Sequence, residues 1–137
     1  MSVRVLVLCV IVASLLVGRS SAESIQKHFE CEVKQVLQLG SRGKFEQNEW
    51  TKLLKRHSDP LMFNQETGEL RWKGDQDTSI FEVVQAGTSS NGVNAVRSFQ
   101  GPAAYVHSFL SIETFTDGWP FYFDDDGTIY TGTCVAG

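Results

Sequence analysis

The chain of 137 residues has little cysteine and lacks the short motifs that mark common catalytic and metal sites. It contains three cysteines, no Cys-X-X-Cys pair, no His-Glu-X-X-His motif and no Gly-X-Ser-X-Gly turn. Zinc sites use closely spaced Cys and His ligands, and an α/β-hydrolase needs the sharp turn that carries its serine. His28, His57 and His107 show no ligand spacing either. We therefore expect no metal, no cofactor and no nucleophilic serine or cysteine.

Basic residues are also scarce. The chain has 12 Lys and Arg against 16 Asp and Glu, and loss of residues 1–22 would leave 10 against 16, a net charge of −6. Binding to nucleic acid or to anionic lipid needs clustered Lys and Arg. The one local basic group, Lys52, Lys55, Arg56 and His57, is interpreted as the end of a helix. We expect no nucleic-acid partner, and the absence of Asn-X-Ser/Thr predicts no N-glycosylation.

Long apolar runs are absent apart from one at the N-terminus. Arg4 precedes a run of 13 apolar or small residues from Val5 to Val17, and Ser20-Ser21-Ala22 follows. A membrane span needs about 20 such residues, so this pattern indicates a signal peptide rather than an anchor. We predict cleavage between Ala22 and Glu23. Residues 23–137 then form one exported domain, periplasmic or extracellular, with no membrane span.

Two cysteines remain after cleavage. Cys31 lies near the new N-terminus and Cys134 lies three residues from the C-terminus. In an oxidising compartment such a pair forms a disulfide, which here would close a loop of roughly a hundred residues. The sequence therefore predicts a Cys31–Cys134 bond that joins the first and last structural segments.

The apolar pattern predicts many short strands and one helix. Phe29, Cys31, Val33, Leu37 and Leu39 alternate with polar residues, apart from an interruption at Gln35 and Val36, which indicates a strand. Trp50, Leu53 and Leu54 have the spacing of one helix face, and Asp59-Pro60 ends that helix. Further strands are expected at 61–63, 70–72, 80–84, 93–99, 104–112, 121–123 and 128–130, the last two joined through Asp126-Gly127.

These elements predict a mainly β fold with one short α-helix. About eight strands joined by hairpins form an antiparallel meander, either a sandwich or a small up-and-down barrel. The helix would cover one face or an open end. The disulfide would tie the first strand to the last, as closure of such a sheet requires.

Aromatic and acidic residues near the C-terminus are the best candidates for a binding site. Half-exposed aromatic side chains give contact area at low entropic cost, and nearby carboxylates suit a basic protein or a carbohydrate. Alternatively, Trp119 closes the core, and the acidic run serves a hairpin turn. The run lacks the spacing of a calcium loop. The candidate binding residues are Trp119, Tyr122, Asp124, Asp125 and Asp126.

Two functions are compatible with these features. The first is a non-catalytic domain that binds a protein partner or a small ligand, for example in an inhibitor-like role. The second is a small hydrolase whose carboxylates are dispersed in the sequence, with Glu113, Asp124 and Asp126 as the acid/base candidates.

Several short segments resemble a group of small uncharacterised secreted proteins of proteobacteria. They are Cys31, the stretch Phe63-Asn64-Gln65-Glu66-Thr67-Gly68, Pro120-Phe121 and Tyr130-Thr131-Gly132-Thr133-Cys134. The resemblance covers most of residues 23–137 and implies a single secreted β domain, with no catalytic residue to carry over. Asn64 stands where an Asp is common in that group, so a carboxylate role at this position is not implied.

Overall fold

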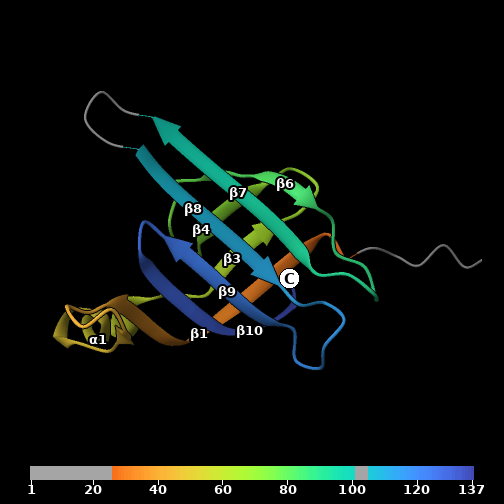
Figure 1. The fold of residues 1–137 in the computed structure, drawn as a ribbon. Helices are drawn as coiled ribbons and strands as arrows, with labels where there is room; N and C mark the ends of the chain where they lie inside the picture. The colour runs from red at the N-terminus through yellow and green to blue at the C-terminus, as the bar shows by residue number, and fades with distance from the viewer. Residues whose placement is uncertain (1–25, 101–104) are drawn as a thin grey trace, which may run out of the picture.

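The computed structural model describes residues 26–100 and 105–137. The proposed signal peptide, its cleavage site at Ala22 and Glu23, and Ala104 lie outside the described residues. Ten strands and one helix follow one another along the chain (Figure 1). Their bounds are β1 (His28–Leu39), β2 (Phe45–Glu46), α1 (Glu49–His57), β3 (Leu61–Asn64), β4 (Glu69–Trp72), β5 (Ser79–Ile80), β6 (Glu82–Gln85), β7 (Val93–Gln100), β8 (Tyr105–Ile112), β9 (Pro120–Asp125) and β10 (Thr128–Ala136).

The strands form one antiparallel sheet that is nearly closed into a barrel. Its order is β5-β4-β3-β1-β10-β9-β8-β7-β6, with β2 paired to the far end of β1. The outermost strands of this order, β5 and β6, are consecutive in the chain and separated only by Phe81. Each strand of the barrel therefore pairs with a neighbour in sequence, except where β1 meets β10. This confirms the predicted mainly β meander and selects the barrel over the sandwich.

The disulfide lies on the seam where the meander closes. Cys31 of β1 and Cys134 of β10 are direct cross-strand partners and are covalently joined, with their Cα atoms 3.9 Å apart. Gly132 permits the same close approach, because a Cβ atom there would lie 1.9 Å from the carbonyl oxygen of Glu32. The predicted Cys31–Cys134 bond is confirmed.

A bulge in β1 explains the interrupted alternation in its sequence. The register with β10 shifts between Val33 and Gln35, so the inward face passes from odd to even positions. Val36 is consequently buried, whereas Leu37 is half-buried and Leu39 is exposed. The predicted strand is present, and the extra residue in β1 reverses the side on which Leu37 and Leu39 lie relative to Phe29 and Cys31.

Inward-facing apolar side chains fill the barrel. Phe29 of β1 and Phe63 of β3 are buried near one end, and Leu110 and Ile112 of β8 line the opposite wall. On β9, Phe121 and Phe123 point inward while Tyr122 between them is half-buried on the outer face, as the alternation predicts. Trp72 and Trp119 pack partly buried against this core.

Helix α1 packs with only part of its apolar surface. Asn48 caps it by accepting a hydrogen bond from the Thr51 amide at 2.8 Å, and the Thr51 hydroxyl accepts one from the Asn48 amide in return. Thr51 is buried and Leu54 is half-buried, but Trp50 and Leu53 are exposed. The predicted Trp50/Leu53/Leu54 face is thus divided. The helix stands out beyond the end of β1 (Figure 1) and does not line the cavity described below.

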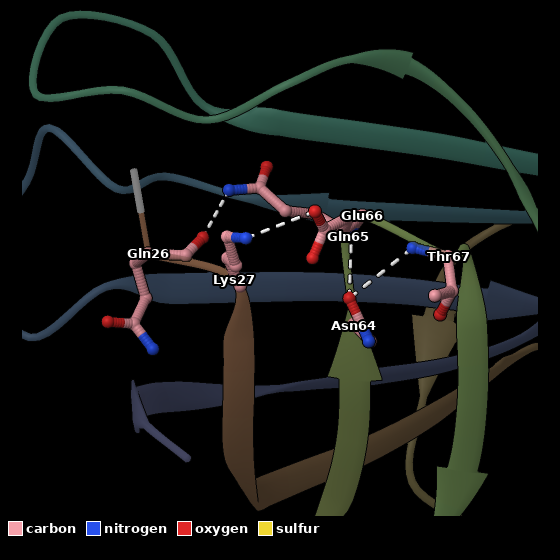
Figure 2. Close-up of polar contacts among 6 residues, drawn as sticks. All are labelled: Gln26, Lys27, Asn64, Gln65, Glu66 and Thr67. Atoms are coloured by element: carbon pink, nitrogen blue, oxygen red, sulfur yellow. Dashed lines mark hydrogen bonds and ion pairs between the residues drawn. The ribbon is translucent and has the colours of Figure 1, made fainter. Parts of the chain in front are cut away.

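The two ends of the barrel differ in their connections. The helix end carries α1, the β4–β5 loop and the β9–β10 turn, whereas the terminal end carries the β3–β4, β6–β7 and β8–β9 loops with both ends of the described chain. At the terminal end, Gln65 is buried and uses both halves of its amide. Its Nε2 donates to the carbonyl of Gln26, as Figure 2 shows, and its Oε1 accepts from the amide of Gly87 at 2.8 Å.

The β3–β4 turn beside Gln65 is also closed by local contacts (Figure 2). The Asn64 side-chain oxygen accepts hydrogen bonds from the amides of Glu66 and Thr67, at 2.9 and 3.3 Å. Gly68 has φ +76°, and a Cβ atom there would lie 2.0 Å from the carbonyl oxygen of Phe81. The turn needs an oxygen acceptor at position 64, which the Asn64 amide supplies. The stretch 63–68 therefore has a structural role as a turn.

Candidate functional site

A polar cluster lies inside the barrel near its helix end. Arg97 of β7 donates from Nη1 to the Ser79 hydroxyl at 2.6 Å and from Nη2 to the Ser108 hydroxyl at 3.4 Å. Ser108, which is fully buried, donates to Asp125 Oδ1 at 2.9 Å, and Arg97 Nη2 is 3.6 Å from the same oxygen. Four strands, β5, β7, β8 and β9, thus bring their inward-facing polar side chains together.

Arg97 is not fully satisfied by this cluster. Its Nε is shielded from solvent and has no hydrogen-bond partner among the described residues. The guanidinium carbon lies 5.4 Å from the centroid of the Phe81 ring, a cation–π contact. The side chain as a whole remains 33% exposed, and that of Asp125 is 44% exposed. The pair therefore has a buried side against the core and an open side toward solvent.

Aromatic rings surround the cluster. The Tyr130 ring lies 5.3 Å from that of Trp72 and 5.7 Å from that of Phe123, and Phe123 contacts Phe81 at 6.1 Å. These rings come from β4, β9, β10 and the segment between β5 and β6. They form an apolar wall around the Arg97–Asp125 pair.

A cavity of about 120 Å³ opens beside this wall. Asp75 and Asp77 of the β4–β5 loop reach its rim, and the Asp77 amide donates to Asp75 Oδ1 at 3.2 Å. Pockets for drug-sized ligands measure roughly 300–1,000 Å³. The cavity therefore suits a molecule of few atoms, or the terminal group of a larger one. Its lining residues are Leu70, Arg71, Trp72, Asp75, Asp77, Ser79, Phe81, Arg97, Phe123 and Asp125.

The surroundings keep the nearby phenol neutral. Burial raises the pKa of Tyr130 above its ordinary value of 10.0, and the negative charge of Asp125 raises it further. The Tyr130 hydroxyl makes no hydrogen bond to any residue that the structure describes. At neutral pH it is thus a donor and an acceptor near the carboxylate.

These groups suit binding by hydrogen bonds and ring contacts. Arg97 supplies donors, Asp125 supplies acceptors, and the Tyr130 hydroxyl can act in both ways. Because the guanidinium and the carboxylate already balance each other, an uncharged ligand leaves that balance intact. Within residues 26–100 and 105–137 no group of three or more His, Cys, Asp or Glu is placed to hold a metal ion.

The three carboxylates of the acidic run, predicted as part of a binding site, lie in three different surroundings. Asp125 faces inward and belongs to the Arg97 cluster. Asp124 faces outward and accepts a hydrogen bond from the Gly127 amide at 2.8 Å. Asp126 has φ 52° and forms the tip of the β9–β10 turn with Gly127. Only one of these three carboxylates thus contributes to the cavity.

The two predicted aromatic residues lie away from the cavity. Tyr122 is on the outer face of β9, 6.2 Å from the Phe109 ring, and burial and Asp124 raise its pKa above 10.0. Trp119 is at the terminal end, where its ring meets Phe29 edge to face at 5.8 Å beside a shallow hollow of about 240 Å³. The structure does not bring Trp119 together with the acidic run.

The carboxylates of the alternative hydrolase hypothesis are also separated. Glu113 follows β8 at the terminal end, where it is exposed and accepts a hydrogen bond from Thr116 at 3.2 Å. Asp124 and Asp126 lie at the helix end, across the length of β9. Glu113 therefore does not share a cleft with either of them.

Arg97 is not among the predicted site residues, although its position in the sequence carries a signal. Val93, Ala95 and Arg97 occupy alternate positions of one strand, and the first two are completely buried. A charged residue in the inward register of an alternating strand must find a partner inside the fold. Its partners could not be identified from sequence because Ser79, Ser108 and Asp125 come from three other strands.

Comparison with models of protein families, with curated proteins and with solved structures finds no match to the chain. In the described part of the chain, no helix has both the length and the apolar character needed to cross a membrane.

Proposed function

We propose that this protein is an exported, non-catalytic binding protein that takes a small uncharged, hydroxyl-rich ligand into the helix-end cavity. A free polyol or the terminal sugar of a longer saccharide has this chemistry. Export is supported by the signal-like segment of residues 1–22 and is compatible with the disulfide.

The observation that carries the proposal is the placement of Arg97. Partial burial of a guanidinium costs free energy even when the group is paired, and apolar residues of similar volume often replace buried ion pairs without loss of stability. Here the Nε of Arg97 also lacks a partner, directly beside a cavity. A group that stability alone does not explain, at the mouth of a cavity, is a candidate for ligand recognition.

The ligand class follows from the lining. Hydroxyl groups both donate and accept hydrogen bonds, so they match a guanidinium and a carboxylate at once. The C–H face of a sugar packs on aromatic rings, which Trp72 supplies at the rim. A charged ligand would instead compete with the Arg97–Asp125 pair for one of its members.

The proposal is tested by titrating the labelled protein with glycerol, glucose and N-acetylglucosamine, and with acetate and methylammonium as charged probes. We expect saturable NMR shifts of the Arg97 Nε–H and Trp72 Nε1–H signals with at least one of the first three. The Arg97→Met/Asp125→Asn variant should lose these shifts.

The matched control is Lys73→Met/Glu30→Gln, which removes an ion pair of 2.9 Å that lies outside the cavity. It should leave the titration unchanged. Three results would contradict the proposal: no response to any hydroxyl compound, equal responses of both variants, or a stronger response to the charged probes.

A further inference from the structure

The charges of the molecule are segregated between two parts. We define the projection as residues 39–57, which comprise the end of β1, β2 and α1. The projection carries five Lys and Arg against two Glu, a net charge of +3. The remainder of residues 26–137 carries five basic and 13 acidic residues, a net charge of −8. The projection is therefore basic although the chain as a whole is acidic. We call the remainder of residues 26–137 the body, and it is strongly acidic.

The same projection exposes four large apolar side chains. Leu39 is 58% exposed, Phe45 52%, Trp50 54% and Leu53 42%. Leu39 and Phe45 are cross-strand partners, so they lie side by side, and Trp50 and Leu53 are three residues apart on one flank of α1. Apolar groups of this size gathered on one small lobe mark an interaction surface.

The helix cannot bury these side chains against its own barrel. Thr51 and Leu54 already face inward, and successive helix residues are rotated by about 100°. Trp50 and Leu53 are consequently offset to one side of the inward face, with Trp50 the nearer of the two to Leu54. The exposure follows from helix geometry and a cap that sets the start of the helix at Asn48.

The cations of α1 lie mostly on its other flank, because a rotation of about 100° per residue sets Lys52 and Lys55 far around the helix from Trp50. Lys52, Lys55 and Arg56 line a shallow hollow of about 410 Å³ together with Gln47. Arg42 and Lys44 precede Phe45 in the same projection. Lys52 is paired with Glu49 at 2.9 Å and Arg42 with Glu46 at 3.9 Å, both on the surface, where such pairs exchange readily with solvent.

We infer that the projection docks the protein on an anionic lipid surface. Trp, Phe and Leu on one side and Lys and Arg on the other are the composition of helices that lie in the lipid interface. Each cation near an anionic bilayer is attracted to it, whereas the acidic body is repelled. The contact is therefore confined to the projection.

The alternative occupant is an acidic protein, and the lysines argue against it. Lys is depleted in protein–protein interfaces, where Arg and aromatic residues prevail. Lys44, Lys52 and Lys55 make up three of the five cations in the projection. Flexible lysines suit a fluid layer of headgroups better than a fixed set of partner atoms.

The experiment is co-sedimentation with vesicles of phosphatidylcholine alone and of phosphatidylcholine mixed with phosphatidylglycerol. The chain should begin at Glu23, because the apolar run of residues 5–17 would itself bind lipid. We expect binding to the anionic vesicles, little binding to the neutral ones, and weakening by salt. Trp50→Ser/Leu53→Ser should weaken binding about tenfold or more.

Two matched controls distinguish binding through the projection from non-specific adsorption to vesicles. Ile80→Ser/Val84→Ser removes two apolar side chains of similar exposure, 60% and 56%, from the body, and should bind as the parent does. Lys55→Glu/Arg56→Glu should abolish binding to anionic vesicles, whereas Lys27→Glu/Lys73→Glu on the body should not.

Thermal unfolding of every variant establishes that it is folded. Failure of the parent chain to bind anionic vesicles would overturn the inference. Equal losses of vesicle binding in the projection variants and the body variants would also overturn it. So would a protein that self-associates, or binds an acidic protein, through the projection but does not bind vesicles. None of these outcomes bears on the cavity at Arg97, whose titration is independent of lipid.

Discussion

The two ends of the barrel differ in whether their buried polar atoms have hydrogen-bond partners. At the terminal end, the Gln65 amide donates to Gln26 and accepts from Gly87, so both of its halves are used. At the helix end, Arg97 keeps a buried Nε without a partner among the described residues, beside a cavity. Gln65 thus uses its hydrogen-bonding groups within the fold, whereas Arg97 keeps one donor that the described residues do not use.

Under the proposed function, this difference separates a polar residue that serves the fold from one that serves binding. An unsatisfied buried donor costs roughly 1–3 kcal/mol, so a small domain keeps few of them. The terminal end shows that this chain can satisfy such a group with backbone atoms of two other segments. We interpret the unpaired Arg97 Nε at the helix end as a group that costs folding stability and serves the proposed ligand binding.

The largest expected effect comes from breaking the seam that both ends share. Cys31→Ser/Cys134→Ser removes the bond between β1 and β10, and we expect a loss of about 2–5 kcal/mol in the free energy of unfolding. Urea denaturation measures it, and the reduced parent protein should behave like the variant. An unchanged midpoint would mean that strand pairing alone holds the seam.

A smaller loss is expected from the terminal end. Gln65→Leu leaves the Gly87 amide and the Gln26 carbonyl without their partner, which should cost about 2–3 kcal/mol. The matched control is Gln85→Leu, since Gln85 is exposed and donates a single hydrogen bond to Gly92. It should cost less than about 1 kcal/mol. Equal losses would remove the special role of Gln65.

The polar pair at the helix end should behave in the opposite way. Arg97→Met/Asp125→Asn is expected to change the free energy of unfolding by less than about 1 kcal/mol, or to stabilise the protein, because it removes an incompletely satisfied ion pair. Calorimetric unfolding at neutral pH measures this change. A loss as large as that of Gln65→Leu would make the two ends alike.

The smallest effect concerns alkaline pH. The pKa of Tyr130 is raised in the folded state, chiefly by burial, so above pH 10.0 the unfolded chain ionises first and stability falls until the folded pKa is passed. Tyr130→Phe should flatten this decline in the thermal midpoint. Tyr122→Phe is the comparison variant. The pKa of Tyr122 is raised too, but Tyr122 is only half-buried on the outer face, so its removal should flatten the decline less than Tyr130→Phe does. An identical decline in all three proteins would contradict the assignment.

Much of the local structure could be predicted because it depends on neighbouring residues. Asp126-Gly127 predicts the tight turn between β9 and β10, and both residues indeed have positive φ. The alternation of Phe121, Tyr122 and Phe123 predicts which of them are buried. The side on which Leu39 lies could not be predicted, since the bulge in β1 is defined only by its register with β10.

The candidate site was less accessible to prediction. The C-terminal acidic run drew attention through its composition, yet only Asp125 reaches the cavity, since adjacent residues of a strand point to opposite faces. Trp119 and Asp124 are close in sequence but lie toward opposite ends of β9. Proximity along an extended strand therefore does not predict a shared site.

By itself, the sequence determined most of the strands, the hairpins, the single helix and the cysteine pair, because periodicity, turn residues and cysteine count act locally or in pairs. It did not indicate β2, or the break at Phe81 that separates β5 from β6. Only the tertiary structure decided that the meander closes, that Arg97 meets Ser79, Ser108 and Asp125, and that Trp50 and Leu53 stay exposed. Those outcomes depend on the register between distant strands and on how much of a helix face its neighbours can cover. No local pattern contains that information.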